Sequence, residues 1–443
     1  MNGNINMNKM KRLIFIFGLI FQISTIHSQG LYFPPVTGSV WDTISPQSLG
    51  WCQYKIDSLY QFLNNNNTKA FILLKNGKIV LEKYFGSFTQ NSLWYWASAG
   101  KTITAFMTGI AQQENLLHIH DTSSQYLGQG WTNCTTLQEE KITIWHQLTM
   151  TSGLDDGVAD HYCTLDTCLI YKADAGTRWA YHNGPYTILD SIIQIATSLP
   201  LNTYTDQKLK TPTGMNGAFL RIGYNNVFFS NARSMARFGL LILNKGNWNG
   251  NPIMTDTNYY NQMVHSSQNL NKSYGYLWWL NGQSHFMAPG SQFVFSGPIF
   301  QHAPLDAFAA LGKNGQFLNV APSQNLVWLR MGDTPDGLDV SFLLNDAIWE
   351  YLNDLACNSS INEEQEKFDF QLFPNPAHHT INIQSKYKIK SIEMHNISGQ
   401  LIYAKQENQH TISISLNKFK PGIYYVTIHS DDDKHCIQKL IIY

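Results

Sequence analysis

Ser98 and Lys101 are the residues of this sequence whose types and spacing most directly suggest chemistry. They stand three residues apart in the stretch WYWASAGKTITAFM, residues 94–107, where an apolar helical pattern begins. A serine hydroxyl is a weak nucleophile until a base removes its proton, and a buried lysine amine can act as that base because burial disfavours the ammonium form. Residues at this spacing share one face of a helix, and the first helical turn has free N–H groups for an oxyanion. The pair is therefore a candidate nucleophile and base.

The spacing alone is weak evidence, because two more serine–lysine pairs with the same spacing occur near the C-terminus. These are Ser385 with Lys388 and Ser415 with Lys418. The residues around them alternate as in β-strands, where the two side chains would not share a helical turn. The helical context therefore distinguishes Ser98, although an ordinary helix start stays an alternative.

Two further motifs follow in order along the chain. The stretch RWAYHNGPYTIL contains Tyr181-His182-Asn183, and FAALGKNGQF contains Lys313-Asn314-Gly315. A Ser-x-x-Lys motif followed by Tyr-x-Asn and Lys-x-Gly would resemble penicillin-recognising serine enzymes. The later motifs also recur elsewhere, at Tyr224/Asn226, Tyr259/Asn261, Tyr351/Asn353, Lys75/Gly77 and Lys420/Gly422. They therefore need support from the rest of the sequence.

The elements that would have to position these residues can be predicted from hydrophobic periodicity and turn signals. Residues 117–220 mix helices and loops. The other predicted elements, in chain order, are a helix in 51–64, a hairpin in 70–86 around Asn76-Gly77, the helix that starts after Ser98, an amphipathic helix in 231–246, a hairpin in 316–332 around Pro322–Asn325, and a helix in 341–357. This order predicts an antiparallel sheet covered by helices, with a helical insertion.

Taken in order, several segments resemble the serine β-lactamase-related family, which includes class C β-lactamases, esterases and 6-aminohexanoate-dimer hydrolases. The similar segments are SLWYWASAGKTITAFMTGIAQQENLL, KITIWHQLTMTSGLDD, GTRWAYHNGPYTIL, SMARFGLLILNKGNWNG, SYGYLWWL and GKNGQFLNVAPSQNLVWLRMGD. The resemblance covers residues 41–355. It implies an α+β fold of the β-lactamase and penicillin-binding-protein type. In that fold the active site lies between an antiparallel sheet flanked by helices and an all-α region.

The resemblance also implies roles for the residues of the first two motifs. Ser98 would be the acylated nucleophile, and Lys101 would take its proton or keep Tyr181 poised. Tyr181 would act as general base in one half-reaction and as general acid in the other. Asn183 would hydrogen-bond the substrate and Lys101.

The third motif would complete the site. By resemblance, Lys313 would line it, favouring a tyrosinate and a substrate carboxylate. The backbone N–H groups of Ser98 and Gln316 would form the oxyanion hole, and Gly315 would supply the small residue that close approach to the following strand needs. Two departures stand out. Many relatives carry histidine in place of Lys313, and His182 replaces a smaller residue, which is expected to narrow the pocket.

The resemblance implies an exported serine hydrolase that forms a serine acyl-enzyme with ester or amide substrates, including peptide or β-lactam-like ones. Two alternatives stay open: a non-hydrolytic penicillin- or peptidoglycan-binding protein of the same fold, and a catalytically inactive surface binding protein. No cofactor or metal is expected, and His118 and His120 are interpreted as surface residues. The sequence lacks a G-x-S-x-G motif, which argues against an α/β-hydrolase. A net charge of −1 without a basic face argues against nucleic acid as a partner.

The first residues predict an export signal. Residues 1–28 combine the basic stretch NKMKR with the apolar run LIFIFGLIFQIS and small and polar residues near Ser28. A membrane anchor is the alternative, but the run is shorter than the about 20 residues that a span needs. No later segment is apolar enough to span, so no stable membrane span is expected once the signal is removed.

Export would place the six cysteines in an oxidising compartment. Cys163 and Cys168 enclose a short loop and are predicted to form a disulfide. Cys52 opens one predicted helix and Cys357 closes another, and we expect these two to pair as well. A zinc site of His161, Cys163 and Cys168 is the alternative, although it lacks a clear fourth ligand.

The composition changes near the C-terminus. The polar, acidic residues 358–367 are interpreted as a linker between a hydrolase domain, residues 30–357, and a small β-sandwich, residues 368–443. The segments FPNPAHHTINI, IEMHNISGQLIYAK, FKPGIYYVTIHS and IQKLIIY resemble the C-terminal sorting domain of type IX secretion substrates. This resemblance implies the secretion machinery as a partner and a secreted or cell-surface location in a Gram-negative-type bacterium. A carbohydrate-binding module is the alternative.

Overall fold

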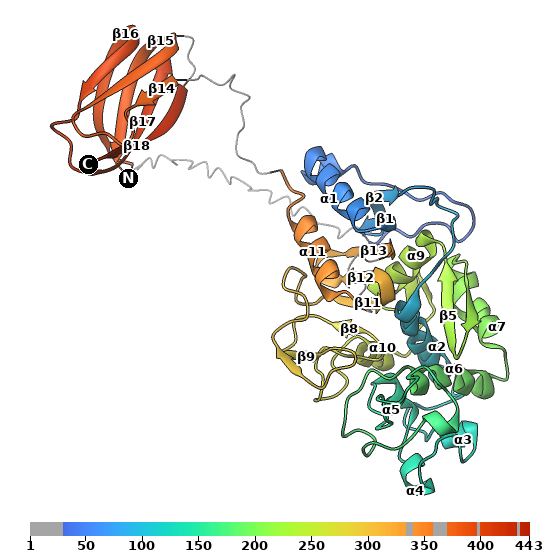
Figure 1. Ribbon diagram of the computed structural model, residues 1–443. Helices are drawn as coiled ribbons and strands as arrows, with labels where there is room; N and C mark the ends of the chain where they lie inside the picture. The colour runs from blue at the N-terminus through green and yellow to red at the C-terminus, as the bar shows by residue number, and fades with distance from the viewer. Residues whose placement is uncertain (1–29, 334–339, 358–369, 397–398, 432–434) are drawn as a thin grey trace, which may run out of the picture. The chain divides into compact units, whose positions relative to one another are not determined.

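The computed structural model describes residues 30–333, 340–357, 370–396, 399–431 and 435–443 (Figure 1). The expected signal peptide, residues 1–28, and the expected linker, residues 358–367, lie outside the described residues. The chain divides into two compact units, Met1–Cys357 and Asn358–Tyr443. Each unit has a hydrophobic core of its own. We call the first, which contains the expected nucleophile Ser98 and the expected base Lys101, the catalytic unit, and the second the C-terminal unit.

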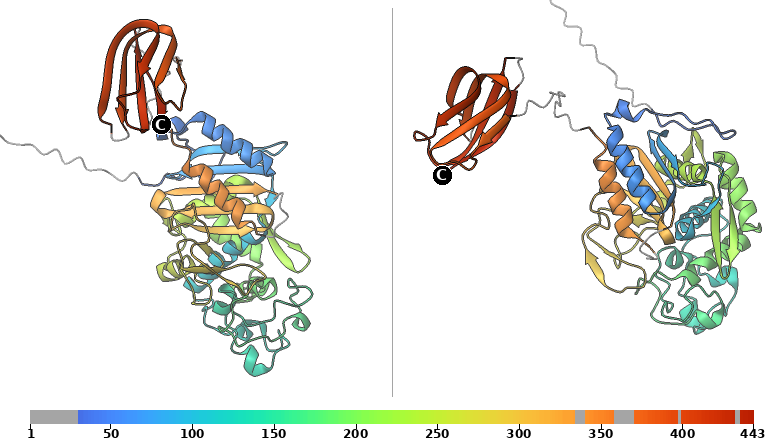
Figure 2. Two further views of the ribbon diagram at one scale, coloured as in Figure 1. Left: turned by 60° about the vertical axis from the view of Figure 1, so that its left-hand side comes forward. Right: turned by 45° about the horizontal axis from the view of Figure 1, so that its top comes forward.

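The catalytic unit is built on a six-stranded antiparallel sheet. Its strands, in spatial order, are β2 (Lys78–Tyr84), β1 (Thr68–Lys75), β13 (Leu326–Gly332), β12 (Gln316–Ala321), β11 (Phe308–Gly312) and β8 (Trp279–Leu280). Every residue of β12 and β13 is buried, so helices must cover both faces of the sheet. Helices α1 (Gln53–Asn65) and α11 (Phe342–Asn353) lie side by side over one face (Figure 2).

Helix α9 (Ala232–Leu243) covers the opposite face. Neighbouring residues of a strand point to opposite faces, and β13 shows both contacts. Trp328 meets Trp349 of α11 with ring centroids 5.6 Å apart. Val327 lies against Gly239 of α9, where an added Cβ would come within 2.5 Å of the valine side chain. The amphipathic pattern of α9 and the bare backbone at Gly239 therefore fix how closely this helix packs on the sheet.

Both predicted hairpins of this sheet are present. Strands β1 and β2 are joined by Asn76 and Gly77, with φ values of 51° and 80°. Two left-handed residues in succession suit a two-residue hairpin turn, which explains the Asn-Gly pair. Strands β12 and β13 are joined by the short turn Pro322–Gln324 and by Asn325, whose φ is 46°.

The helical insertion surrounds two long helices, α2 (Lys101–Gln113) and α6 (Asn183–Thr197). Residues 101–111 of α2 are all buried, as expected for a helix enclosed on every side. The shorter helices are α3 (Ser124–Leu127), α4 (Thr136–Glu139), α5 (Ile144–Leu148), α7 (Leu201–Thr205), α8 (Thr211–Thr213) and α10 (Thr257–Met263). The small strands are β3 (Trp94–Tyr95), β4 (Ala218–Ile222) and β5 (Asn225–Ser230) in one sheet, β6 (Asn247–Trp248) with β7 (Asn251–Pro252), and β9 (His285–Met287) with β10 (Val294–Ser296).

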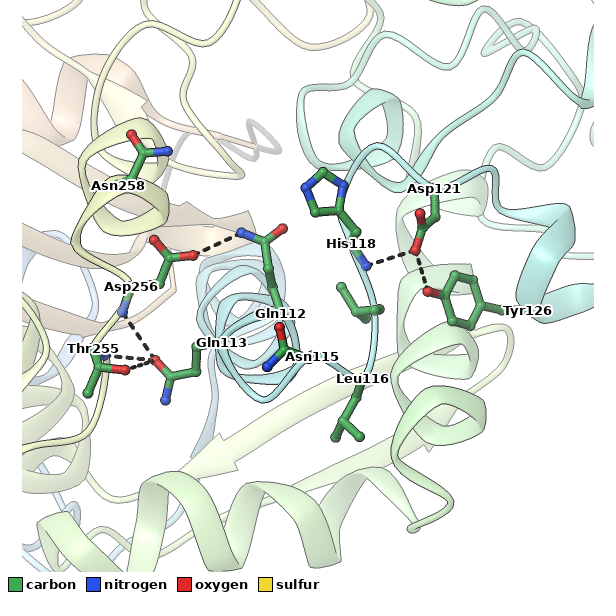
Figure 3. Close-up of a pocket in the computed structure, with 11 residues that line it drawn as sticks. Gln112, Gln113, Asn115, Leu116, His118, Asp121, Tyr126, Thr255, Asp256 and Asn258 are labelled. Carbon is green, nitrogen blue, oxygen red and sulfur yellow. Dashed lines mark hydrogen bonds between the residues drawn. The ribbon is translucent and has the colours of Figure 1, made fainter.

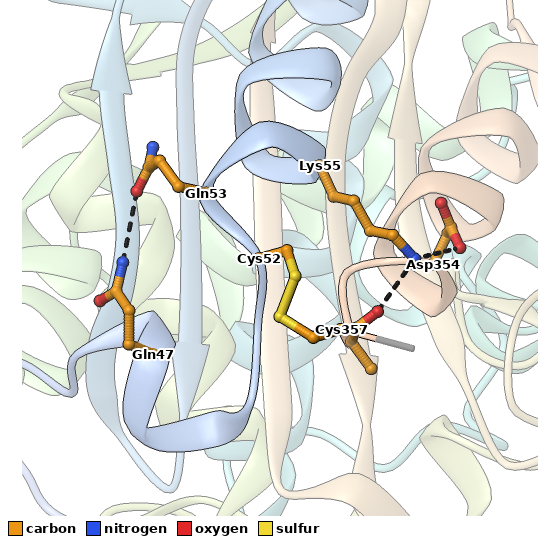
Figure 4. The surroundings of a disulfide bond; sticks show 7 residues. Gln47, Cys52, Gln53, Lys55, Asp354 and Cys357 are labelled. Atoms are coloured by element: carbon orange, nitrogen blue, oxygen red, sulfur yellow. Dashed lines mark hydrogen bonds and ion pairs between the residues drawn. A yellow bond between two sulfur atoms is a disulfide. The ribbon is translucent and has the colours of Figure 1, made fainter. Parts of the chain in front are cut away.

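Two disulfides are present, Cys52–Cys357 (Figure 4) and Cys163–Cys168, so both expected pairs are bonded. The zinc alternative is wrong, because the bond between Cys163 and Cys168 occupies the two sulfurs that it required. The Cys52–Cys357 bond joins residues 305 positions apart. Beside it, Lys55 Nζ donates to Asp354 Oδ1 at 2.8 Å and to the Ala356 carbonyl at 2.9 Å.

The C-terminal unit is all β, as predicted. Its strands are β14 (Phe370–Phe373), β15 (Thr380–Asn396), β16 (Leu401–Ser415), β17 (Gly422–Ser430) and β18 (His435–Ile442), all antiparallel. The start of β15 pairs with β14 and its end with β17, so the sheet curls on itself. Four of the six predicted β runs join in pairs into β15 and β16, with a register shift between Gln384 and Ile389. Across the described residues of both units, no helix has the length and apolarity that crossing a bilayer requires.

Candidate active site

Ser98 lies at the junction between a small sheet and the central helix of the catalytic unit. Strand β3 leads into a 3₁₀ turn, Ala97–Gly100, and α2 begins at Lys101. Ala97 has a φ of 46°, in the left-handed region that side chains disfavour. Such local strain is frequent at functional sites, where the surrounding structure holds it in place.

Lys101 is the buried partner of Ser98. Its side chain reaches back over the turn, and Nζ lies 3.0 Å from Ser98 Oγ and 2.8 Å from Asn183 Oδ1. The residue is only 4% exposed. Burial lowers the pKa of Lys101 from 10.5 to about 7, and the negative charge of Asp190 acts in the opposite direction. At neutral pH a large fraction of this amine is therefore unprotonated, which is the form that can accept a proton.

Tyr181 shares the same buried space. Its ring stacks on Trp279 of β8, with centroids 5.8 Å apart, and Lys101 Nζ lies 5.2 Å from the Tyr181 ring centroid. Burial raises the pKa of Tyr181 well above its usual value, while a hydrogen bond with Ser98 lowers it and the charge of Tyr162 raises it. Burial therefore disfavours the tyrosinate that Lys313 was expected to favour, and the neutral phenol can donate a proton.

Asn183 and His182 stand at the start of α6. Asn183 is buried and accepts a hydrogen bond from Lys101. The lysine belongs to α2, so a residue of the neighbouring helix α6 fixes the end of its side chain. His182 is buried as well, and burial lowers its pKa to about 4, which keeps the ring neutral. The ring lines neither of the two pockets at Ser98, so the expected narrowing of the pocket by His182 is wrong.

The third predicted motif forms a turn between two strands. Lys313–Gly315 are a 3₁₀ turn between β11 and β12, and Gly315 has a φ of 73°, which favours glycine. The close approach to the serine turn falls one residue before the motif, at Gly312. A Cβ added to Gly312 would lie 2.4 Å from the Trp96 carbonyl oxygen and 3.0 Å from the Ala99 nitrogen. The bare backbone of β11 therefore passes directly against the turn that carries Ser98.

Lys313 and Gln316 take different positions around this turn. Lys313 is exposed and lines both pockets at Ser98. Gln316 is fully buried, and its amide bonds to the backbone, with Oε1 accepting from the Gly332 nitrogen at 3.0 Å and Nε2 donating to the Lys313 carbonyl at 3.2 Å. The Gln316 side chain therefore connects the turn to the end of β13. The role of the Gln316 backbone N–H as an oxyanion donor stays a prediction.

Two cavities meet at Ser98. The larger has a volume of about 390 Å³, and we call it the apolar pocket because most of its exposed lining surface is apolar, although polar side chains line it as well. The smaller, the polar pocket, has a volume of about 170 Å³. The apolar pocket includes Tyr95, Tyr186, Ile222, Val227, Phe229 and Asn226, and the polar pocket includes Asp156, His161, Tyr181, Pro289 and Gly290. Four residues line both: Ser98, Tyr162, Asn183 and Lys313.

Several residues around the site were missed by sequence reasoning. Asn226 belongs to one of the recurring Tyr-x-Asn patterns, and Gly312 directly precedes the Lys313 motif, so both had a local signal. Trp279, Tyr95 and Asp190 had none, because they reach the site only through tertiary packing.

A third pocket lies away from Ser98, between the end of α2 and the start of α10, and has a volume of about 710 Å³ (Figure 3). Gln112 Nε2 donates to Asp256 Oδ2 at 3.0 Å across it, and the Tyr126 hydroxyl donates to Asp121 Oδ2 at 2.6 Å. None of the predicted catalytic residues lines it. His118 and His120 are exposed, as expected. In the described ranges, no group of three His, Cys, Asp or Glu side chains is arranged to hold a metal ion.

Comparison with known families supports this architecture. A family model described as Beta-lactamase matches residues 67–352, and one described as Secretion system C-terminal sorting domain matches residues 371–443. The sorting domain indicates type IX secretion and a secreted or cell-surface location. No curated protein sequence matches the chain.

Solved structures share the fold of the catalytic unit. A protein named as a beta-lactamase, from Bacteroides dorei DSM 17855, is 16% identical with a TM-score of 0.55, and the match covers 69% of this chain and 99% of that one. A protein named as a 6-aminohexanoate-dimer hydrolase, from Bacillus anthracis, is 20% identical with a TM-score of 0.55, covering 73% and 91%. A family VIII carboxylesterase is 14% identical with a TM-score of 0.51, covering 68% and 98%. At these identities the likeness establishes the fold.

Proposed function

This chain belongs to the beta-lactamase family through residues 67–352, and from that premise we propose that it is a serine hydrolase that forms an acyl-enzyme on Ser98 with ester or amide substrates. One observation carries the proposal: Lys101 Nζ lies 3.0 Å from Ser98 Oγ in a buried position that lowers the lysine pKa to about 7. A general base is most effective when its pKa lies near the working pH and its nitrogen is within hydrogen-bond reach of the proton.

In the proposed acylation step, the neutral amine of Lys101 takes the Oγ proton as Ser98 Oγ bonds to the substrate carbonyl carbon. The tetrahedral oxyanion then collapses, and the bond from that carbon to the leaving alcohol or amine breaks. The Tyr181 hydroxyl, which is neutral and hydrogen-bonded with Ser98, gives its proton to the leaving group. The ammonium of Lys101 restores the Tyr181 proton, so both side chains return to their starting states.

In the proposed deacylation step, water attacks the acyl carbon and gives a proton to Lys101. The bond between the carbonyl carbon and Ser98 Oγ breaks, and the proton returns to Oγ. The sum is substrate plus water to acid plus alcohol or amine. Asn183 holds the substrate and keeps Lys101 in reach of Oγ throughout.

We propose backbone N–H groups as the oxyanion donors, those of Ser98 and Gln316. Because Gly312 lies against the serine turn, the N–H of the next residue, Lys313, is a further candidate. The apolar pocket would hold the larger apolar part of the substrate, and the exposed ammonium of Lys313 would meet a carboxylate where the substrate carries one. A signal peptide at residues 1–28 and the sorting domain would together deliver the enzyme outside the cell.

The test is p-nitrophenyl ester hydrolysis by the full chain, with Ser98→Ala beside wild type. Ser92→Ala is the matched control, because Ser92 lies six residues upstream and lines neither pocket. We expect Ser98→Ala to lose at least about 10³-fold in kcat and Ser92→Ala to keep wild-type turnover. Intact mass after addition of a penicillin completes the test. An adduct without turnover would identify a penicillin-binding protein, and neither turnover nor adduct would identify an inactive binding protein.

A further inference from the structure

Helices α2 and α6 meet along a buried row of polar side chains below the site. We call this row the polar seam: Lys101 and Thr104 on α2, and Asn183, Tyr186 and Asp190 on α6. The spacings of three residues on α2, and of three and four on α6, place each set on one helix face. Nearest the pockets, Lys101 bonds to Asn183. One turn deeper, Thr104 Oγ1 lies 3.4 Å from the Tyr186 hydroxyl and donates to Asp190 Oδ1 at 3.0 Å.

Asp190 is an acid that the proposed reaction does not use. It is 1% exposed and lines neither pocket, so it meets no substrate. Both carboxylate oxygens are bonded, because Oδ2 accepts from Asn226 Nδ2 of β5 at 3.0 Å while Oδ1 accepts from Thr104. A buried carboxylate is costly unless donors and an opposite charge compensate it. Here the donors are neutral.

The opposite charge comes from Lys101. Lys101 lies one turn before Thr104 on α2, and its positive charge favours the ionised carboxylate of Asp190. From β5 the facing group is the neutral Asn226, and on α6 itself Tyr186 feels the charge of Asp190. The effect is mutual, because Asp190 is the charged group that favours the ammonium form of Lys101. Around Lys101, Ser98 and Asn183 are hydrogen-bonded to Nζ, and the rings of Tyr181 and Tyr186 have their centroids 5.2 Å and 4.3 Å from it. Burial keeps both phenols neutral, so none of these four neighbours brings a charge.

We propose that Asp190 is a positioning residue for Lys101: its carboxylate, fixed by Thr104 and Asn226, sets how firmly the lysine holds its proton. The inference rests on the proposed function, in which Lys101 is the base. It adds a residue that touches neither substrate nor nucleophile and acts only through the lysine.

The sign of the effect follows from the charges. Burial raises the pKa of Asp190 from 3.8 to about 7, the same range in which Lys101 titrates. When Asp190 ionises, its negative charge holds the proton on Lys101 and lowers the fraction of free amine. Removing the charge while keeping the shape, as in Asp190→Asn, would therefore free the amine at lower pH. A role in folding alone would lower activity at every pH and leave the pH dependence unchanged.

The first readout is the pH profile of kcat/KM for ester hydrolysis by the full chain. In Asp190→Asn we expect the midpoint of the acidic limb to move to lower pH by about 1 pH unit, the size of one close charge interaction. The conservative variant Asp190→Glu keeps a carboxylate at this buried position, outside both pockets, and should leave the midpoint near that of wild type. Thr108→Val is the matched control, because it removes one buried hydrogen bond of α2, to the Thr104 carbonyl at 2.8 Å, without changing a charge.

The second readout does not depend on turnover. Because the folded pKa of Asp190 lies above its unfolded value, the contribution of Asp190 to stability falls as pH rises from about 4 to about 7, and Asp190→Asn removes that contribution. The melting temperature of Asp190→Asn relative to wild type should therefore rise across this window. All twelve tryptophans precede Cys357, so tryptophan fluorescence follows the catalytic unit alone.

An unmoved midpoint in Asp190→Asn overturns the proposal, and so does a melting difference that stays constant with pH. If wild type shows no turnover, the proposed function fails by itself and the role toward a catalytic base fails with it. The melting series then still decides whether Asp190 titrates inside the fold, so the two failures are distinguishable.

Discussion

At the scale of single residues, the proposed mechanism depends on two side chains that share one buried space and are both kept neutral there. Burial favours the neutral forms of both Lys101 and Tyr181, but the consequences differ. A neutral amine is a proton acceptor, and a neutral phenol is a proton donor. The pair can therefore serve both ends of an acyl transfer without a metal ion or a histidine.

Tyr181→Phe tests this division of labour. We expect kcat to fall by about 10²–10⁴, the range for a general acid or base, because the leaving group loses its proton donor. The ring would keep its stack on Trp279, so KM should change little. Steady-state kinetics with p-nitrophenyl and alkyl esters would measure both constants.

The control is Tyr126→Phe, which removes a phenol hydroxyl in the pocket away from Ser98, where it donates to Asp121 Oδ2 at 2.6 Å. It should leave kcat close to wild type. A Tyr181→Phe enzyme with unchanged kcat on every ester would remove Tyr181 from the mechanism.

Part of the site could be predicted at this scale. The approach of Lys101 to Ser98 follows from three-residue spacing at a helix start, a purely local property. The contact of Lys101 with Asn183 came only from the family resemblance, because 82 residues separate them. Asp190 could not be predicted, since a lone aspartate in an apolar helical pattern gives no sign of which strand or helix it will face.

At the scale of elements, the site depends on how closely backbones approach one another. β11 passes the serine turn at Gly312, α9 passes the sheet at Gly239, and the β1–β2 turn passes the N-terminal segment at Gly77. At Gly77 an added Cβ would lie 1.9 Å from the Tyr32 carbonyl oxygen, and the φ of 80° is itself unfavourable for a side chain. A side chain at position 77 would therefore be disfavoured twice, by the left-handed backbone conformation and by the clash with the Tyr32 carbonyl.

Gly77→Ala and Gly86→Ala separate these costs. Gly86 also has a positive φ, of 59°, but an added Cβ would meet nothing within 4 Å. We expect Gly86→Ala to lose about 1 kcal/mol of unfolding free energy from backbone conformation alone. Gly77→Ala should lose clearly more, because the Tyr32 backbone must also move. Urea unfolding followed by tryptophan fluorescence would measure both, and equal losses would show that the contact with Tyr32 costs nothing.

Local signals explain which elements could be predicted. The Asn76-Gly77 pair and the amphipathic pattern of α9 are decided within a few residues, and the structure confirms both. The hairpin turn at Lys313–Gly315 was not predicted. Asn314 and Gly315 have left-handed φ values of 61° and 73°, but unlike Asn76-Gly77 they are not flanked by a clear alternation of apolar and polar residues. The joining of short β runs into β15 was missed because a register shift, and no break, separates them.

At the scale of the whole molecule, the two units have separate cores and separate tasks. The family model for the hydrolase ends at residue 352, and the model for the sorting domain begins at residue 371. The formal charge of the whole chain is nearly balanced, at −1. The catalytic unit is closed by the Cys52–Cys357 disulfide immediately before the second unit begins.

The two disulfides should differ in what they contribute to stability. Cross-linking a long loop restricts the unfolded chain more than cross-linking a short one. Loop-closure entropy gives about 6 kcal/mol for Cys52–Cys357 and about 2 kcal/mol for Cys163–Cys168. We expect Cys52→Ala/Cys357→Ala to lower the unfolding free energy clearly more than Cys163→Ala/Cys168→Ala, as measured by denaturant unfolding with tryptophan fluorescence. The reverse order would show that the short loop is held mainly by native contacts.

The same bond between Cys52 and Cys357 decides how the hydrolase would bear a mechanical load. If the C-terminal unit tethers the protein to a surface, any pull arrives at residue 357. The disulfide transmits that force to Cys52, the residue before α1. Residues 52 to 357 therefore form a covalently closed loop, and the C-terminal unit is attached at the end of that loop. Helix α11 then lies inside the loop and cannot be peeled from the sheet. Cutting the tether, likewise, would leave the loop and the serine within it intact.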